Sequence, residues 1–302
     1  MPKPILFDVI IIGGSYAGLS AAMALGRSLR RVLVIDSGTP CNAQTPHSHN
    51  FVTHDGTPPA EIARLAKQQV SEYPNVTFVS GLATEVTQGL CGFDVKTWDG
   101  EYFTSRKLLL ATGIEDIMPE VDGASECWGI SLIHCPYCHG YEYRNEKTGI
   151  LANGEMAFEM ARLVSNWTKD LTIFTDGDPG LTADQIAKLN SKNIEIIHTE
   201  VEALMHESGY MTSVVLSDGS KKEVKAIYTR PAFIQQSDIA EKLGCEFQPS
   251  GHIKVDPFQK TTIPGVYAAG DNCFQMRSVP SSVFAGSLAG SMINRELIDE
   301  DF

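Results

Sequence analysis

Residues 7–26 read FDVIIIGGSYAGLSAAMALG, and this stretch decides the fold. An apolar run ends in two adjacent glycines, Gly13 and Gly14, and an alanine-rich segment of helical character follows them. A buried strand, a glycine turn and a helix form the opening unit of a dinucleotide-binding fold. The glycine pattern G-x-G-x-x-G fits only if Ser15 replaces the second glycine. The small side chain of serine still permits the backbone and a dinucleotide to approach each other closely.

A second buried strand, 32–35, ends at Asp36, which lies 23 residues after Gly13. An acidic residue about 20 residues after the first glycine bonds the ribose hydroxyls of an adenosine. The glycines then make the tight turn, and the helix N-terminus meets the pyrophosphate. Because an aspartate here favours a free 2′-hydroxyl, we expect FAD or NAD rather than NADP. The alternative is an ordinary α/β turn whose glycines serve packing.

Two further strands end in small residues. One is 108–113, and the other is 265–271, which adds an aspartate after its last glycine. Such an acid suits the ribityl chain of a flavin, and the helix expected over 281–297 directs its N-terminus toward the flavin pyrimidine. The expected cofactor-binding residues are Gly13, Gly14, Ser15, Ala17, Gly18, Asp36, Ser37, Asn50, Thr112, Gly113, Gly270 and Asp271.

The loop 41–56 contains three histidines, His47, His49 and His54. No carboxylate or cysteine completes a convincing set of metal ligands with them. We therefore expect a surface or flavin-edge loop without a metal, in which Asn50 offers its amide to the edge of the flavin ring.

Residues 135–139 read CPYCH and carry the chemistry. Two cysteines at this spacing close a small disulfide ring, and a helix N-terminus lowers the pKa of the first thiol. Pro136 suits the first helical turn, so the pair is predicted to be a redox dithiol. The alternative is half a zinc site completed by His134 or His139. Against it, the remaining cysteines offer no second pair: Cys41, Cys91, Cys127, Cys245 and Cys273.

The length and the amino-acid composition are those of a globular protein, and 302 residues are enough for two domains. A net charge of −13 argues against a nucleic-acid partner. No apolar run approaches the roughly 18 residues of a membrane span, and no signal peptide is recognised, so no membrane association is expected. Scattered cysteines do not resemble a secreted disulfide framework, and we expect a cytoplasmic protein.

Together these pieces resemble the low-molecular-weight thioredoxin reductase family of flavoproteins. The motifs that carry the resemblance are the Gly13 turn with Asp36, the strand 110–113, the pair Cys135 and Cys138, and the segment 265–271.

The resemblance implies an α/β fold of two Rossmann-like, three-layer domains, with the second inserted into the first. The FAD-binding domain would comprise 1–116 and 240–302, and the inserted NAD(P)-binding-like domain, 117–239, would carry the dithiol. It also implies a homodimer, with Cys138 facing the flavin and Cys135 exchanging with an outside partner.

The inserted domain departs from the reductases that use NADPH. Its turn begins with Ala152 instead of glycine, and its next strand ends in Thr175-Asp176-Gly177, where the family places His-Arg-Arg. Each lost phosphate contact is worth about 1.5–3 kcal/mol, and Asp176 would repel a phosphate, so NADPH is not expected. Asp176 lies at a distance from the turn along the chain that would let it hold the ribose of NADH. Two possibilities therefore stay open: the inserted domain binds NADH, or its nucleotide-binding fold serves only as a scaffold.

The residues after the dithiol, Cys138-His139-Gly140-Tyr141-Glu142, carry histidine where NADPH thioredoxin reductases carry aspartate. This pattern looks like the branch of the gliotoxin- and holomycin-type dithiol oxidases, near reductases driven by ferredoxin or a flavin. The resemblance makes His139 the candidate catalytic acid/base, because an ordinary histidine pKa of about 6.5 lets it accept a thiol proton. The alternative for His139 is a helix-start residue exposed to water. Glu142 would orient His139, or would merely be a favourable acid in the first helical turn.

We therefore predict an FAD-dependent thiol–disulfide oxidoreductase of the thioredoxin reductase type. It would exchange electrons through Cys135 and Cys138 with a thioredoxin-like protein or a small disulfide, and ferredoxin or a reduced flavin are candidate donors. Two alternatives stay open: an oxygen-dependent oxidase of a small dithiol, and a flavin-bearing redox sensor.

Overall fold

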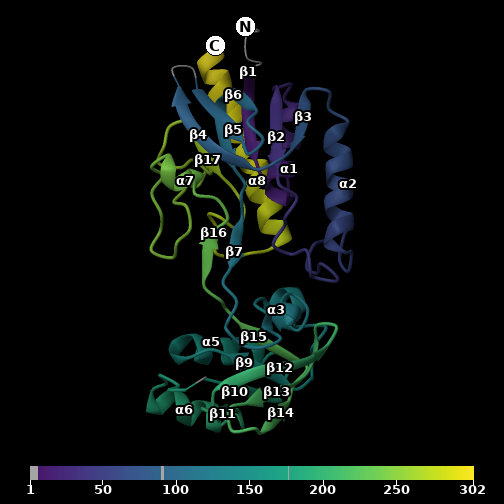
Figure 1. Cartoon of the computed structure of the whole chain (residues 1–302), viewed down its shortest axis with the longest axis vertical. Coiled ribbons are helices and arrows are strands. Elements are labelled where there is room, and N and C mark those ends of the chain that lie inside the picture. The colour runs from purple at the N-terminus through teal and green to yellow at the C-terminus, as the bar shows by residue number, and fades with distance from the viewer. Residues whose placement is uncertain (1–5, 90–91, 176) are drawn as a thin grey trace. The chain divides into compact units, whose positions relative to one another are not determined.

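The computed structural model describes residues 6–89, 92–175 and 177–302, which form two compact units (Figure 1). Unit 1 comprises 6–43, Pro59–Glu115 and Phe233–Phe302, and unit 2 comprises Gln44–Pro58 and Asp116–Ala232. Asp176, the residue singled out for NADH, and Cys91 lie outside the described residues. The predicted α/β class, with two Rossmann-like parts and one inserted into the other, is confirmed.

Unit 1 is built on one seven-stranded sheet in the order β3-β2-β1-β6-β5-β4, with β17 beside β6. The strands β1, β2, β3, β6 and β17 run parallel, whereas the pairs of β5 with β4 and β6 are antiparallel. The bounds are β1 (Leu6–Ile12), β2 (Val32–Asp36), β3 (Val76–Ser80), β4 (Ala83–Gly89), β5 (Gly92–Thr97), β6 (Tyr102–Leu110) and β17 (Val266–Ala268).

Both faces of the parallel part of this sheet are covered, which explains its continuous apolar strands. Val9 and Ile11 face α1 and α8, while Ile10 and Ile12 face the β5 and α7 side, as alternation along a strand requires. The helices are α1 (Tyr16–Arg27), α2 (Pro59–Ser71), α7 (Ile239–Lys242) and α8 (Val279–Asp301).

The small residues of α8 pack against α1. A Cβ on Gly286 would lie 2.0 Å from the carbonyl oxygen of Ala17, and one on Gly290 would lie 2.8 Å from that of Ala21. Only glycine therefore allows the two backbones to approach this closely. Gly286 and Gly290 therefore serve the packing of α8 on α1.

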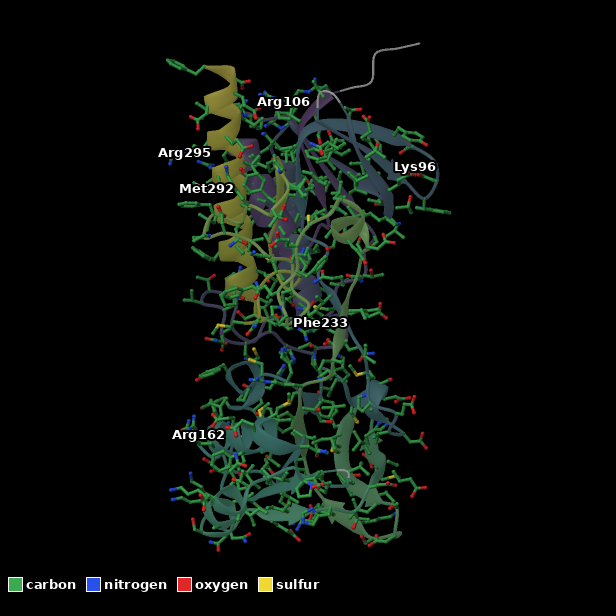
Figure 2. The ribbon with its side chains drawn as sticks, turned by 90° about the vertical axis from the view of Figure 1, so that its left-hand side faces the viewer. Lys96, Arg106, Arg162, Phe233, Met292 and Arg295 are labelled. Carbon is green, nitrogen blue, oxygen red and sulfur yellow. The ribbon has the colours of Figure 1, made fainter. Side chains whose placement is uncertain are left out.

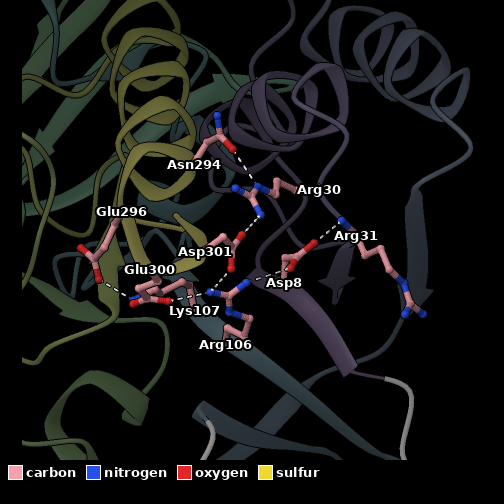
Figure 3. A network of polar contacts seen from close by, with 9 residues as sticks. All are labelled: Asp8, Arg30, Arg31, Arg106, Lys107, Asn294, Glu296, Glu300 and Asp301. Atoms are coloured by element: carbon pink, nitrogen blue, oxygen red, sulfur yellow. Dashed lines mark hydrogen bonds and ion pairs between the residues drawn. The ribbon is translucent and has the colours of Figure 1, made fainter. Parts of the chain in front are cut away.

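The C-terminal end of α8 is tied to the middle of β6 by a network of ion pairs, which Asp8 of β1 joins through Arg106 (Figure 3). Lys107 is buried and pairs with Glu296 at 2.5 Å and with Glu300. Arg106 reaches Glu300 and Asp301, both at 2.8 Å. Burial raises the pKa of Glu296, but hydrogen bonds from Lys107 and its other partners outweigh this and lower it to about 2.

Replacing Lys107 by methionine should lower the free energy of unfolding by about 1–3 kcal/mol, because Glu296 would lose a buried partner while remaining partly in contact with water. Since the pKa of folded Glu296 lies near 2, the loss should be complete above about pH 4.5 and shrink as pH falls toward 2. Chemical denaturation between pH 2.5 and 7 measures it. The exposed pair of Arg64 with Glu61 is the control, and Arg64→Met should leave the free energy of unfolding close to the wild-type value at every pH. A pH-independent loss at Lys107 would contradict the electrostatic account.

Unit 2 has three layers around a parallel sheet in the order β11-β10-β9-β15-β8. The helices α5 (Gly154–Val164) and α6 (Ala183–Asn190) supply residues to the core on one face. The short helix α3 (Ala124–Cys127) and a three-stranded antiparallel sheet pack on the other. The strands are β8 (Leu132–Ile133), β9 (Thr148–Leu151), β10 (Leu171–Phe174), β11 (Glu195–Ile197), β12 (Val201–Glu207), β13 (Tyr210–Leu216), β14 (Lys221–Glu223) and β15 (Ala226–Thr229).

The chain leaves unit 1 through β7 (Ile114–Asp116) and returns through β16 (Phe233–Gln235), and these two strands pair with each other. The predicted FAD-binding domain included 1–116 as one uninterrupted segment. In the structure, 44–58 packs within unit 2 instead. With its amide oriented to match its neighbours, Gln44 donates to the carbonyl oxygens of Ser125 and Trp128. Among the described helices, none combines the length and apolar character of a membrane span.

Candidate active site

The dithiol lies where β8 passes into the short helix α4 (Pro136–His139). Cys135 is the N-terminal cap of α4, with extended backbone angles of φ −118° and ψ 108°, and Pro136 is the first helical residue. The two thiols are part-buried, and Cys138 Sγ lies 2.6 Å from Cys135 Sγ. This is the geometry expected of a pair that opens and closes a disulfide.

The pKa of the Cys135 thiol is lowered. The hydrogen bond with Cys138 lowers its pKa, burial opposes this, and the amides of Cys138 and Tyr137 and the charge of Arg230 add to the lowering, to about 7. By contrast, burial raises the pKa of Cys273 to about 12. Cys135 is therefore substantially a thiolate at neutral pH, which is what attack on a disulfide needs.

Arg230 is a functional candidate that sequence reasoning missed. It follows β15, which pairs in parallel with β8 through Ile227 opposite Leu132 and Tyr228 opposite Ile133. Continuing that register by two residues sets Arg230 level with Cys135. The exposed guanidinium can thus stabilise the thiolate from the adjacent strand.

Alkylation of Cys135 in the reduced protein should be half-maximal near pH 7, since the pKa of its thiol is about 7. In Arg230→Gln this midpoint should rise by roughly half a unit, because one stabilising charge is lost. Arg230→Lys keeps the charge and should leave the midpoint in place. Rates of iodoacetamide labelling, followed on the Cys135 peptide by mass spectrometry, measure this. An Arg230→Gln midpoint equal to that of the wild type would contradict the role.

His139 and Glu142 do not form the expected partnership. His139 is part-buried, so the alternative of a water-exposed residue is wrong. Burial and the nearby His49 lower the pKa of His139 to about 4, which makes it a weaker proton acceptor than an ordinary histidine. Glu142 lies beside His49 instead, with Oε1 3.5 Å from Nε2.

The zinc alternative finds no support in the described residues. They contain no group of three or more His, Cys, Asp or Glu side chains arranged to hold a metal. His134 stacks on Trp128, with ring centroids 5.8 Å apart.

In unit 1 the glycine turn is shaped by close contacts. Gly13 has φ +106°, and a Cβ there would lie 2.2 Å from the carbonyl oxygen of Ala111. A Cβ on Gly18 would lie 1.9 Å from the carbonyl oxygen of Gly13. The amide of Gly14 donates to Asp36 Oδ1 at 3.0 Å, which brings the strand-end acid to the turn as expected. Ser15 caps α1 without a side-chain hydrogen bond, so it does not compete with an anion for the helix amides.

A second part of the site lies where β6 and β17 end side by side. Ala268 is opposite Leu110, so the segments 111–113 and 269–271 leave the sheet at the same edge. A Cβ on Gly270 would be 3.2 Å from Ala17 Cβ, which places this edge against the N-terminal turn of α1. Asp271 Oδ2 lies 3.6 Å from Arg277 Nε.

Asn272 was not singled out from the sequence, and it supplies the test of whether FAD fits. Its side chain is fully buried and donates to Leu110 O at 2.9 Å and to Thr112 Oγ1 at 3.3 Å. Its Oδ1 has no hydrogen-bond partner among the described residues. A buried acceptor without a donor costs about 1–3 kcal/mol, so a bound group that donates here is favoured. The glycine cradle, Asp36 and Asn272 together fit FAD.

Two further expected cofactor residues, Asn50 and Ser37, remain predictions. Asn50 lies in the loop 44–58 of unit 2, where its backbone N–H donates to Asp55 Oδ1 at 2.8 Å. Ser37 is exposed, and its Oγ lies 3.0 Å from Thr39 Oγ1.

The corresponding turn of unit 2 is engaged by its own chain. Gly154 begins α5 with φ +57°, and its amide donates to the carbonyl oxygen of Pro179 at 2.7 Å. In a dinucleotide-binding fold the amides of this turn face the pyrophosphate. Thr175, where the arginine-bearing family pattern would begin, is buried and donates to Gly177 O at 2.7 Å.

Comparison with known proteins gives consistent matches over nearly the whole chain. Residues 7–286 match the family described as pyridine nucleotide-disulphide oxidoreductase. Thioredoxin reductase tcpT of Claviceps purpurea is 33% identical over 97% of this chain and 95% of its own length.

Solved structures agree. A putative thioredoxin reductase TrxB from Bacillus anthracis superposes with a TM-score of 0.93 at 32% identity, covering 98% of this chain and 100% of that one. HlmI superposes with a TM-score of 0.92 at 33% identity, covering 98% of this chain and 93% of that one. The family predicted from the sequence is confirmed.

Proposed function

The chain belongs to the pyridine nucleotide-disulphide oxidoreductase family, and from this premise we propose that it exchanges electrons between FAD and a partner disulfide or dithiol through Cys135 and Cys138, without NADPH. The observation that carries the proposal is the N-capping Cys135, whose pKa falls to about 7 beside a second thiol at 2.6 Å.

The cysteines perform the exchange as follows when the partner is oxidised. A partner thiolate attacks Cys135 Sγ of the closed disulfide, the bond to Cys138 breaks, and Cys138 leaves as a thiolate. A second partner thiolate attacks the partner sulfur of the mixed disulfide, so the partner leaves as a disulfide and Cys135 regains its thiolate. The pair has gained two electrons, and the thiol protons pass to the enzyme thiols or water. Bound FAD supplies a two-electron acceptor or donor for this pair.

Two features of unit 2 support independence from NADPH. The segment 175–181 reads TDGDPGL and contains no arginine to clamp a 2′-phosphate. The Gly154 amide already donates to the carbonyl oxygen of Pro179 at 2.7 Å, so this N–H would have to break that bond to donate to a pyrophosphate. The same contact disfavours NADH, although the spacing of Asp176 from the turn suits a ribose.

We propose that unit 1 binds FAD and that unit 2 carries the dithiol. This keeps the sequence division into 1–116 with 240–302 and 117–239, with three changes: 44–58 and Asp116 move to the dithiol-bearing part, and 233–239 moves to the FAD-binding part. Candidate partners are a thioredoxin-like protein and a small dithiol or disulfide. Ferredoxin or a reduced flavin is the candidate donor for the reductive direction.

We also propose a homodimer that uses the outer face of α8. Phe284, Ile298 and Phe302 are exposed apolar side chains on or at the end of this helix. Arg295 is exposed on the same helix and points outward in Figure 2, whereas Met292 is partly buried against the core of unit 1. A second copy would cover this apolar surface, and the mass in solution, by light scattering, should be twice that of one chain.

An oxygen-dependent dithiol oxidase is the second candidate, favoured by the run Cys138-His139-Gly140-Tyr141-Glu142 and its resemblance to the gliotoxin- and holomycin-type oxidases. There the partner dithiol becomes a disulfide, and molecular oxygen accepts two electrons and two protons to give hydrogen peroxide.

Two assays distinguish the oxidase from the reductase. Oxygen uptake with equal formation of hydrogen peroxide from a small dithiol supports the oxidase. Reduction of thioredoxin by protein supplied with reduced ferredoxin or dithionite supports the reductase. Activity in neither assay would remove the proposal.

A further inference from the structure

The loop 44–58 is a folded excursion of the chain. The residues before and after it belong to unit 1, whereas the loop itself packs within unit 2. Ser48 is buried and bridges to Thr57, with Ser48 N donating to Thr57 O at 2.9 Å and Gly56 N donating to Ser48 O at 2.8 Å. The loop therefore has a compact shape that its own hydrogen bonds define.

The two ends of this loop are joined in unit 1 by the hydroxyl group of Tyr16. Tyr16 is the first residue of α1 and is buried, and its hydroxyl donates to the carbonyl oxygen of Pro59 at 3.3 Å. The side-chain amide of Asn42 donates to the same hydroxyl at 3.4 Å. One side chain thus holds the chain just before the loop to the chain just after it, and we call these contacts the neck.

The first residues of the loop are fastened to the segment of unit 2 that leads to the dithiol. The side-chain amide of Gln44 donates to Ser125 O at 3.2 Å and to Trp128 O at 2.9 Å. Thr45 lies against Gly129, whose φ is +73°, and a Cβ on that glycine would lie 2.9 Å from Thr45 Oγ1. We call these contacts the clasp.

The neck and the clasp are too near each other along the chain to move far apart. Asn42 and Gln44 are two positions apart, so their Cα atoms can separate by at most about 7 Å. Apart from this loop, the chain passes between the units at 115–116 and 232–233, where β7 and β16 form one two-stranded ribbon. Two units joined by a single ribbon are expected to move relative to each other. A loop anchored in both units removes that freedom unless the neck or the clasp opens.

We propose that the loop 44–58 is a strap that restrains rotation of the dithiol-bearing unit against unit 1. The strap stays closed while the Tyr16 neck and the Gln44 clasp both hold, and unit 2 turns only when one of them opens. The strap thereby limits how far the dithiol can travel. The inference does not depend on which partner or electron donor the dithiol serves.

Either end of the strap can be released by one substitution. Tyr16→Phe removes the hydroxyl that both flanks share, and Gln44→Ala removes the amide that holds Ser125 and Trp128. Because the neck and the clasp act in series, opening one releases the strap, so the double variant should behave like each single variant. Two contacts that acted independently would give effects that add. The control is Val52→Ala, since this side chain of the same loop is 83% exposed.

The test measures the distance between the units in the full-length protein with its dithiol closed. Spin labels are attached at Gln69→Cys on α2 and Lys188→Cys on α6, which are exposed helix positions in the two units. Cys41→Ser and Cys91→Ser remove two other thiols from the background. Pulsed double electron–electron resonance then reports the distribution of distances between the labels.

The intact strap and the Val52→Ala control should each give one narrow distance peak. Tyr16→Phe, Gln44→Ala and the double variant should each give a distribution at least about twofold wider, because the ribbon then acts as a hinge. Hydrogen exchange of the Ser48 and Gly56 amides should also quicken about tenfold in both single variants, since the loop opens more often once its anchors are lost.

A wide distribution with the strap intact, or widths that stay narrow in all three variants, would overturn the strap. A double variant clearly wider than either single variant would overturn the series arrangement, and unchanged exchange at Ser48 and Gly56 would overturn the anchoring. Gln44 is exposed, so Gln44→Ala keeps the test decisive even if Tyr16→Phe fails to fold. Neither readout requires electron transfer, so failure in every thiol and disulfide assay would remove the proposed function and leave the strap standing.

Discussion

Replacing Cys138 by serine should abolish turnover with any thiol or disulfide partner and lower kcat/KM at least ~10³-fold, as should Cys135→Ser. A serine hydroxyl closes no disulfide, so the pair can neither accept nor give two electrons. The matched control is Cys127→Ala, a buried cysteine of the same unit whose pKa is raised by burial. Its activity should stay within about twofold of the wild type.

The two serine variants also separate the roles of the sulfurs. If Cys135 is the exchanging thiol, Cys138→Ser should accumulate a mixed disulfide with the partner, because the second enzyme thiol that would resolve it is absent. Cys135→Ser should accumulate none. Intact-mass spectrometry after reaction with an oxidised partner decides this, and trapping in Cys135→Ser alone would reverse the assignment.

NADPH should reduce the bound flavin at least ~10³-fold more slowly than a competent donor does. The family pattern supplies several phosphate contacts worth about 1.5–3 kcal/mol each, and losing two or three costs about 4 kcal/mol or more, a thousandfold in binding. The Gly154 N–H, which donates to the carbonyl oxygen of Pro179, would also have to give up that hydrogen bond to bind a pyrophosphate. Stopped-flow absorbance under anaerobic conditions, with NADH run in parallel and dithionite as the positive control, measures the difference. Full bleaching by NADPH within seconds would contradict it.

Local sequence patterns predicted most of the fold. The run 7–26 with Asp36 was sufficient for the nucleotide fold, because strand, turn and helix there depend on neighbouring residues. The contact of the Gly14 amide with Asp36 follows from that same short segment. The spacing within 135–139 likewise located the capped dithiol, since a Cys-Pro start at a helix is a local feature.

The missed features depend on contacts between distant segments. Arg230 reaches Cys135 only because β15 pairs with β8, and sheet order is not visible in a single sequence. Asn272 became a candidate only through its burial and its unpartnered Oδ1. Glu142 was assigned to His139 as its sequence neighbour, whereas the fold brings His49 to it from 93 positions away (142 − 49).

The most direct test of the central claim is anaerobic addition of a small dithiol to the purified yellow protein while its flavin absorbance is recorded. We predict bleaching of the wild type, no bleaching of Cys135→Ser or Cys138→Ser, and a flavin band that NADPH leaves in place. A protein that purifies without flavin, or bleaching that proceeds equally without the two cysteines, would contradict the account.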